Sequence, residues 1–184
     1  MTAAPIVPTA TASFGNFFRE GPILPMSTVR TQQIAALAQT HATLLHLTEG
    51  LMDDILDFHA GADEWSVREI LAHLVDDEIY VMRTRMERII KEDLPLLAPH
   101  DEKRWYATRN TTRDRLAELL SDFAVQRAAS LAMLRMLRTE DWARQGNQPE
   151  YGIFTAEVWL GRWLEHDTVH IEQIRRTLEV FDKR

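Results

Sequence analysis

Hydrophobic residues recur at helical spacing along most of the chain. In the first such stretch the repeating positions are Ile34, Leu37, Leu44, Leu51, Ile55 and Phe58. His41 and Thr48 occupy the remaining positions of the same stripe. Because residues three, four or seven apart share one face of an α-helix, the pattern predicts an amphipathic helix over residues 28–59.

A second helix is predicted over residues 66–92. Ser66 and Glu69 have the spacing of a capping box, in which each side chain hydrogen-bonds the backbone N–H of the other residue. Asp93 and Pro95 mark the end of the helix. Residues 93–110 then lack any periodicity and are long enough for a crossover rather than a tight turn between neighbours. The bundle is therefore not expected to run simply up, down, up and down.

Two further helices complete the pattern, over residues 112–138 and 155–181. The first carries a clean leucine-rich stripe, and Thr155 can cap the second. Between them, residues 139–154 contain two glycines and a proline and are predicted to form a loop. No alternating run of β-branched residues predicts a sheet.

The chain therefore divides into a tail and a bundle. Prolines forbid a continuous helix in residues 1–26, which are expected to form an extended or flexible N-terminal tail. Residues 27–184 are expected to form one domain. Its fold class is all-α, a four-helix bundle with a long crossover between the second and third helices.

Composition narrows the possible chemistry. A formal net charge of -7 leaves no basic surface for a phosphate backbone, so a nucleic-acid partner is not expected. The chain has no cysteine, which excludes disulfides, thiolate metal sites and a cysteine nucleophile, and any metal must be bound by His, Asp or Glu. The N-terminus lacks the pattern of a secretory signal and there is no long apolar run. We therefore expect a cytoplasmic protein without a membrane partner.

His166 and His170 are the first candidates for metal ligands. They lie four residues apart, so both rings project from one helical face and can share one ion. Stepping along that face passes Trp159 and Trp163, which indicates an inward-looking stripe. A metal satisfies two neighbouring buried rings more simply than two separate hydrogen-bond networks do. A pair of hydrogen-bonded core histidines remains the alternative. Asp167 stands where a zinc protease needs its general-base glutamate, so that class has little support.

The motifs in their order resemble those of the DinB/YfiT-like superfamily of four-helix metal-binding proteins. The resemblance is carried by a helix start at Trp65-Ser66 that leads into His73-Leu74. Near the C-terminus it continues in His166-Asp167-x-x-His170-Ile171-x-Gln173. It extends over most of residues 28–182 and leaves the tail outside.

This resemblance implies three metal ligands, His73, His166 and His170. It also implies a divalent metal, zinc or nickel, with a coordination position open to water, and a homodimer as the common assembly.

Several residues near these histidines are candidates for supporting roles. Asp77 lies one turn after His73, and Gln173 lies near His170, so each could accept a hydrogen bond from a ligand ring. Tyr80 and Trp163 are candidates for walls of a pocket around the site. An arrangement of two histidines and one carboxylate is a weaker match. The carboxylate of such a site could come from one of three acidic residues close to His73, namely Asp76, Asp77 and Glu78.

The other histidines are expected to be surface residues. The rise along an antiparallel neighbouring helix places His41 and His46 away from the level of His73. His59 and His100 belong to regions predicted as loops.

Two classes of function fit these features. The first is a metal-dependent enzyme acting on a small molecule, either a hydrolase or, as the resemblance implies, a thiol S-transferase that uses a low-molecular-weight thiol. The second is a non-catalytic, stress-associated bundle in which the metal is structural. No catalytic residue beyond the metal ligands is assigned from the sequence.

Overall fold

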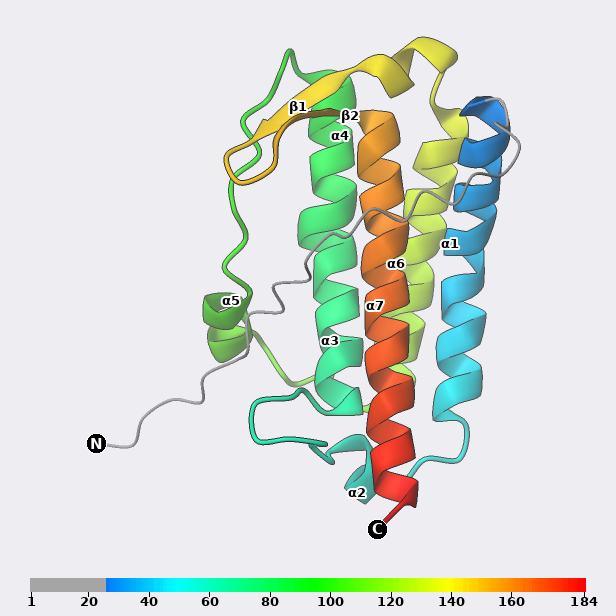
Figure 1. Cartoon of the computed structure of the whole chain (residues 1–184), viewed down its shortest axis with the longest axis vertical. Coiled ribbons are helices and arrows are strands. Elements are labelled where there is room, and N and C mark those ends of the chain that lie inside the picture. Colours follow the sequence, from blue (N-terminus) through cyan, green and yellow to red (C-terminus); the bar gives the residue numbers. More distant parts are fainter. Residues whose placement is uncertain (1–25) are drawn as a thin grey trace.

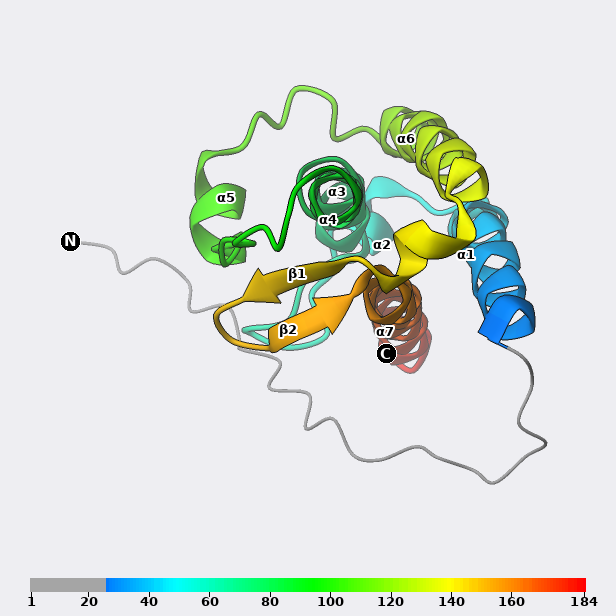
Figure 2. The same cartoon turned by 90° about the horizontal axis from the view of Figure 1, so that it is seen from above.

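The computed structural model describes residues 26–184, and the predicted tail over residues 1–25 lies outside the described part. The described chain is mainly helical. Four long helical segments stand side by side, and Figures 1 and 2 show them from the side and from above. None of the described helices is long and apolar enough to cross a membrane.

The first segment is shorter than the sequence pattern predicts. Helix α1 spans Met26–Thr48, and a separate short helix, α2, spans Asp53–Leu56. Gly50 lies between them with a φ of 72°, a left-handed conformation that commonly ends helices and that glycine adopts without steric cost. The predicted helix over residues 28–59 is therefore wrong beyond Thr48. The periodicity continues because Leu56 and Phe58 are still buried against the bundle.

The second segment matches its predicted bounds but contains a wide turn. Helix α3 spans Val67–Asp77, a π-helical turn η1 spans Glu78–Arg83, and helix α4 spans Thr84–Lys91. Both hydrogen bonds of the predicted capping box form between Ser66 and Glu69. Such π turns insert extra residues into an α-helix and are frequent at functional sites.

The third and fourth helices are close to their predictions. Helix α6 spans Leu116–Met136, and helix α7 spans Ala156–Asp182 with Thr155 as its N-cap. The crossover before α6 is mostly irregular, as expected, but it also contains the short helix α5, Glu102–Thr108. In Figure 1, α3–α4 and α6 run in the same direction, which requires this long connection. The prediction of a bundle that is not simply up-down is confirmed.

The stretch predicted as a loop contains regular structure. A short helical turn η2, Thr139–Ala143, leads into strands β1, Gln145–Gln148, and β2, Gly152–Thr155. The strands pair as an antiparallel hairpin above the ends of α4 and α7 (Figure 1). The sequence of β1, Gln-Gly-Asn-Gln, has no β-branched residue to signal a strand.

A polar layer divides the hydrophobic core into two clusters. Each of the four long helical segments contributes one buried side chain to this layer, and those side chains are Thr40, Glu78, Arg127 and Asp167. The cluster near the hairpin includes Trp159 and Trp163, and the cluster near the C-terminus includes Phe123 and Ile174. Buried charges require partners, and Arg127 donates to all three of the other side chains of this layer.

Candidate metal centre

Three imidazoles from two helices meet beside the polar layer. His73 extends from α3, and His166 and His170 extend from consecutive turns of α7. One ligand atom from each residue can be chosen so that all three lie within 4.8 Å of one another. The ring centroids of His73 and His170 are 4.5 Å apart, as are those of His166 and His170.

The nitrogen geometry is compatible with a shared ion. The Nε2 atoms of His73 and His166 lie 3.2 Å apart. Two nitrogens bound to one tetrahedral zinc at about 2.0–2.1 Å would lie roughly 3.3–3.4 Å apart, so this spacing fits. Without a metal, one of these nitrogens donates a hydrogen bond to the other. His170 Nδ1 lies 2.7 Å from the Gln173 side-chain oxygen and can donate to it, which leaves Nε2 of His170 with its lone pair.

Buried charge favours a cation at this place. Asp77, Glu78 and Asp167 are 3%, 1% and 1% exposed, and Arg127 is 2% exposed. With all three imidazoles neutral, as metal ligation requires, three carboxylates against one guanidinium leave two uncompensated negative charges beside the histidines. A divalent cation would balance them, and buried charge is costly without such balance.

The pKa values of the histidines follow from this environment. Burial lowers the pKa of His73 to about 4, against an opposing effect of Asp77. Burial also lowers the pKa of His170 well below its usual value. Burial acts in the same direction on His166, but its interactions with Asp167 and Asp77 outweigh it and raise the pKa to about 9. Two rings are thus neutral at pH 7 and one holds a proton in the metal-free protein.

The two predicted supporting residues lie beside the histidines. Asp77 Oδ1 lies 3.6 Å from His73 Nδ1, and Asp77 Oδ2 lies 3.4 Å from His166 Nε2. Gln173 faces His170, as described above. In the described part of the chain, Asp77 Oδ1 and His166 Nδ1 are buried without a hydrogen-bond partner. Such atoms carry a desolvation cost that a bound ion or water would reduce.

The two predicted wall residues lie in different surroundings. Tyr80 is 53% exposed and packs against Trp105 of α5, with ring centroids 4.7 Å apart. Trp163 is fully buried, and its indole N–H donates to Glu78 over 3.1 Å. Trp163 therefore contacts the polar layer from within the core. Another aromatic residue, Trp65, flanks the histidines: its ring centroid lies 4.8 Å from that of His73, and Tyr106 stacks against it at 5.7 Å.

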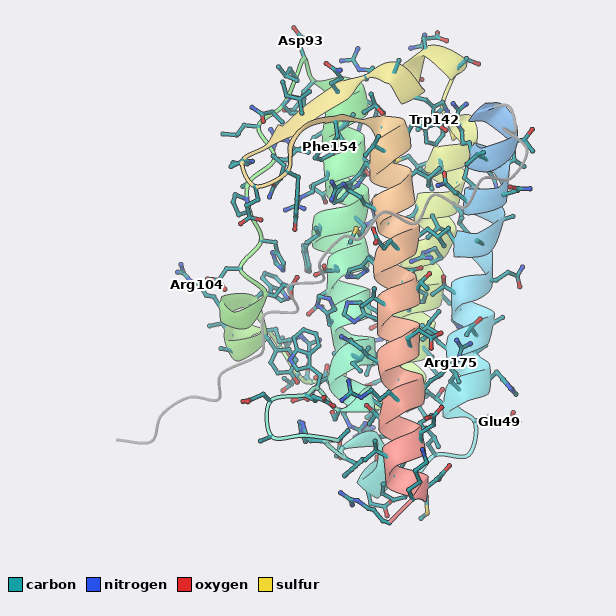
Figure 3. The ribbon with its side chains drawn as sticks, in the orientation of Figure 1. Glu49, Asp93, Arg104, Trp142, Phe154 and Arg175 are labelled. Atoms are coloured by element: carbon teal, nitrogen blue, oxygen red, sulfur yellow. The ribbon has the colours of Figure 1, made fainter. Side chains whose placement is uncertain are left out.

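The crossover supplies two groups that the sequence did not assign to the site. His100 was expected to be a surface residue, but its Nε2 lies 3.6 Å from Asp77 Oδ1 and its side chain is only 21% exposed. Glu102 offers a carboxylate oxygen within 4.8 Å of ligand atoms of His73 and Asp77. The sequence around these two residues has no hydrophobic periodicity, because the crossover is irregular, so nothing in it indicated that they lie at the site. Figure 2 shows α5 standing opposite α3, and Figure 3 shows side chains in the space between the two helices.

The remaining histidines lie apart from the group. His41 is partly buried and its ring faces Phe123 at 6.4 Å. His46 and His59 are exposed. None of the three belongs to a potential metal-binding group of the described residues.

The chain is similar to known proteins both in sequence and in structure. The chain is 27% identical over 144 residues to the protein named "Putative metal-dependent hydrolase YfiT" of Bacillus subtilis (strain 168), over 77% of this chain and 79% of the relative. It is 25% identical over 146 residues to YuaE of the same strain, an uncharacterized protein, over 73% and 90% of the two chains.

A solved structure of YfiT from Bacillus subtilis superposes with a TM-score of 0.78 at 23% identity, covering 90% of this chain and 94% of that one. Its title describes a probable metal-dependent hydrolase with an unusual four-helix bundle topology. This likeness confirms the predicted fold class. The sequence model of the DinB superfamily matches residues 36–174, which is most of the chain. The protein therefore belongs to the DinB superfamily.

Proposed function

We propose that this protein is a metal-dependent hydrolase of a small-molecule substrate, with His73, His166 and His170 as ligands of one divalent ion. The observation that carries the proposal is the meeting of three imidazoles beside buried carboxylates whose charge is not balanced. Relatives named as metal-dependent hydrolases support the reaction class.

Three nitrogen ligands suit catalysis better than a purely structural role. Structural zinc sites use four protein ligands, whereas catalytic sites use three and keep a position for water or substrate. A divalent ion held by His73, His166 and His170 would lower the pKa of water and so make a nucleophile available near neutral pH. Gln173 accepts from His170 and so fixes which nitrogen of that ring is free to bind.

Asp77 and Glu102 are the carboxylates placed to handle protons. Asp77 is held ionised, because interactions with His73 and His166 lower its pKa to about 2 despite its burial. Partial desolvation and the nearby charge of Asp77 raise the pKa of Glu102, although its side chain still reaches solvent. Glu102 is thus suited to accept a proton from the nucleophile and release it to solution.

Zinc and nickel both accept imidazole ligands, so three histidines suit either metal. The alternatives of thiol transfer and of a structural metal are separated from hydrolysis by the experiment below.

The test begins with elemental analysis of protein purified without an affinity metal. About one zinc or nickel per chain is expected, and His73→Ala and His170→Ala should each abolish tight retention, since two ligands rarely hold a divalent ion against buffer. His41→Ala is the matched control, a partly buried histidine outside the group, and should retain the metal.

The loaded protein is then assayed against a panel of small esters and amides. Hydrolysis should disappear with a chelator and return with the ion. Unchanged metal content in both site variants would refute the ligand assignment. Metal retention without any hydrolysis, or turnover only with an added low-molecular-weight thiol, would refute the hydrolase assignment and leave the ligand set intact.

A further inference from the structure

The π turn brings Arg85 onto the face of the α3–α4 rod that carries Asp77. Arg85 follows Asp77 by eight residues, whereas two turns of α-helix take about 7 residues. The wide turn at Glu78–Arg83 accommodates the additional residue. Arg85 therefore projects from the same side of the α3–α4 rod as Asp77, about 12 Å farther along its axis.

The crossover runs along this face and fixes the position of Arg85. The Arg85 guanidinium donates to the carbonyl of Ala98 over 2.8 Å, and His100, two residues later, lies against Asp77. The guanidinium also lies 5.3 Å from the ring of Trp159 on α7. Arg85 on α4 thus contacts both the crossover and α7, the helix that supplies two of the candidate ligands.

Arg85 lacks a counter-ion within the described part of the chain. No carboxylate of residues 26–184 forms an ion pair with it, although Asp77, Glu102 and Glu150 act on it electrostatically from a greater distance. It is partly buried, and this burial lowers its pKa. A guanidinium removed from water without an anion is energetically costly, and four of its five N–H groups make no hydrogen bond to residues 26–184.

Arg88 provides the contrast, one turn farther along α4. It also donates to a crossover carbonyl, that of Leu96, over 2.8 Å. Its remaining donors pair with Glu92 over 2.8 and 2.7 Å. Arg88 is therefore a neutralised residue that holds the crossover, whereas Arg85 does the same and keeps an unused positive charge.

Other groups around Arg85 suit a ligand that extends from the candidate metal centre. Arg162 lies one turn before His166 on α7, with its guanidinium 4.6 Å from the ring of Tyr151 in the hairpin turn. This places Arg162 on the same side of α7 as the histidines. Tyr80 and Tyr151 are 53% and 47% exposed, so this side of the molecule is open to solution.

We propose that Arg85 binds an anionic group of the substrate, a carboxylate or a phosphate, while the bond to be hydrolysed lies at the histidine centre. This inference rests on the proposed function and adds a substrate class to it. Guanidinium groups bind both anions in bidentate fashion. Because of the axial separation, the anionic group must lie several bonds from the reacting one.

The test uses hydroxamates, which chelate a bound metal, with tails of graded length that end in a carboxylate, a phosphonate or an uncharged methyl ester. Their dissociation constants are measured by calorimetry on the zinc-loaded full-length protein. At the best tail length, an anionic end should strengthen binding about tenfold or more over the ester, as expected for a charge-assisted hydrogen bond. The stronger of the two anions identifies the natural group.

Three variants make the result specific. Arg85→Gln should erase the preference for the anionic tail and leave binding of the ester unchanged. Arg85→Lys should keep part of the preference, because the charge remains and the bidentate fork is lost. Arg88→Gln is the matched control and should keep all of it. Circular dichroism and metal content establish that each variant is folded and loaded.

An equal affinity for charged and uncharged tails in the natural protein would overturn the inference, as would a full preference in Arg85→Gln. In either case, tight binding of the ester shows that the metal centre itself is intact. If no hydroxamate binds the zinc-loaded protein at all, the proposed function falls and this inference falls with it.

Discussion

Replacing Arg127 by methionine should destabilise the protein more than any exposed substitution. The Arg127 guanidinium is the only cation of the buried polar layer among the described residues. It donates to Glu78 over 3.0 and 2.8 Å and to Asp167 over 2.6 and 3.1 Å. It also donates to the carbonyl of Leu37 over 2.9 Å. Methionine has a similar length but satisfies none of these acceptors.

The magnitude follows from what the substitution leaves behind. Removing one partner of a buried ion pair costs about 3–5 kcal/mol, because the other charge stays buried without compensation. Here two carboxylates lose the same cation, and they recover part of the cost by taking up protons. We therefore expect a loss of about 3–5 kcal/mol at pH 7. For a chain of this size that corresponds to a fall in Tm of roughly 6–20 °C.

The loss of stability caused by Arg127→Met should depend on pH in a definite direction. In the natural protein, burial raises the pKa of Asp167, but its interactions with His166 and Arg127 outweigh that effect and lower it to about 2. Without Arg127 the effect of burial gains weight, and the folded variant binds protons more readily than its unfolded chain. The stability deficit of the variant relative to the natural protein should therefore shrink as the pH falls from 7 towards 5.

Urea unfolding followed by circular dichroism, on chelator-treated protein at pH 7 and pH 5, measures both effects. Arg135→Met is the control, since Arg135 is exposed on the same helix and its loss should change stability by less than about 0.5 kcal/mol. Adding Glu78→Gln and Asp167→Asn to Arg127→Met should restore much of the loss, because no charge then remains in the polar layer. A deficit below about 1 kcal/mol at pH 7, or one that grows at pH 5, would refute the reasoning.

Three further outcomes are expected. Gln173→Leu removes the acceptor of His170 and should weaken metal binding by about 10–100-fold in a chelator competition, whereas unchanged affinity would remove Gln173 from the site. Metal binding at pH 7 should release about one proton per ion, because His166 has a raised pKa and must lose its proton to bind the metal. The affinity for the metal should therefore fall as the pH falls. Calorimetry in buffers of different ionisation enthalpy measures the release, and finding none would contradict this prediction. Gly146→Ala would bring a Cβ to 2.8 Å from Leu97 in the buried core and should cost about 1–3 kcal/mol in urea unfolding; an unchanged midpoint would show that Leu97 yields freely.

The helices were largely predictable because their signals are local. The capping box at Ser66 and Glu69 and the cap at Thr155 act within one turn, and both form as expected. The periodicity that identifies α6 and α7 likewise reports only which face of a helix is buried. For the same reason the first helix was predicted too long. Its stripe describes burial, and the residues after Gly50 remain buried although the helix has ended.

The candidate site was predictable where it depends on one helix. His166 and His170 share a face by spacing alone, and the resemblance to a family added His73. The structure brings all three side chains together, and their role as ligands stays a prediction until metal is measured.

The sequence by itself determined the amphipathic helices, their caps and the placement of two histidines on consecutive turns of one helical face. Only the tertiary structure decided which groups meet those histidines from other segments. His100 and Glu102 come from an irregular crossover, and Arg127 comes from a helix that carries no ligand. The physical reason is that helical periodicity encodes burial against an unspecified neighbour, whereas charge pairing and convergence at a site depend on how segments far apart in the chain pack together.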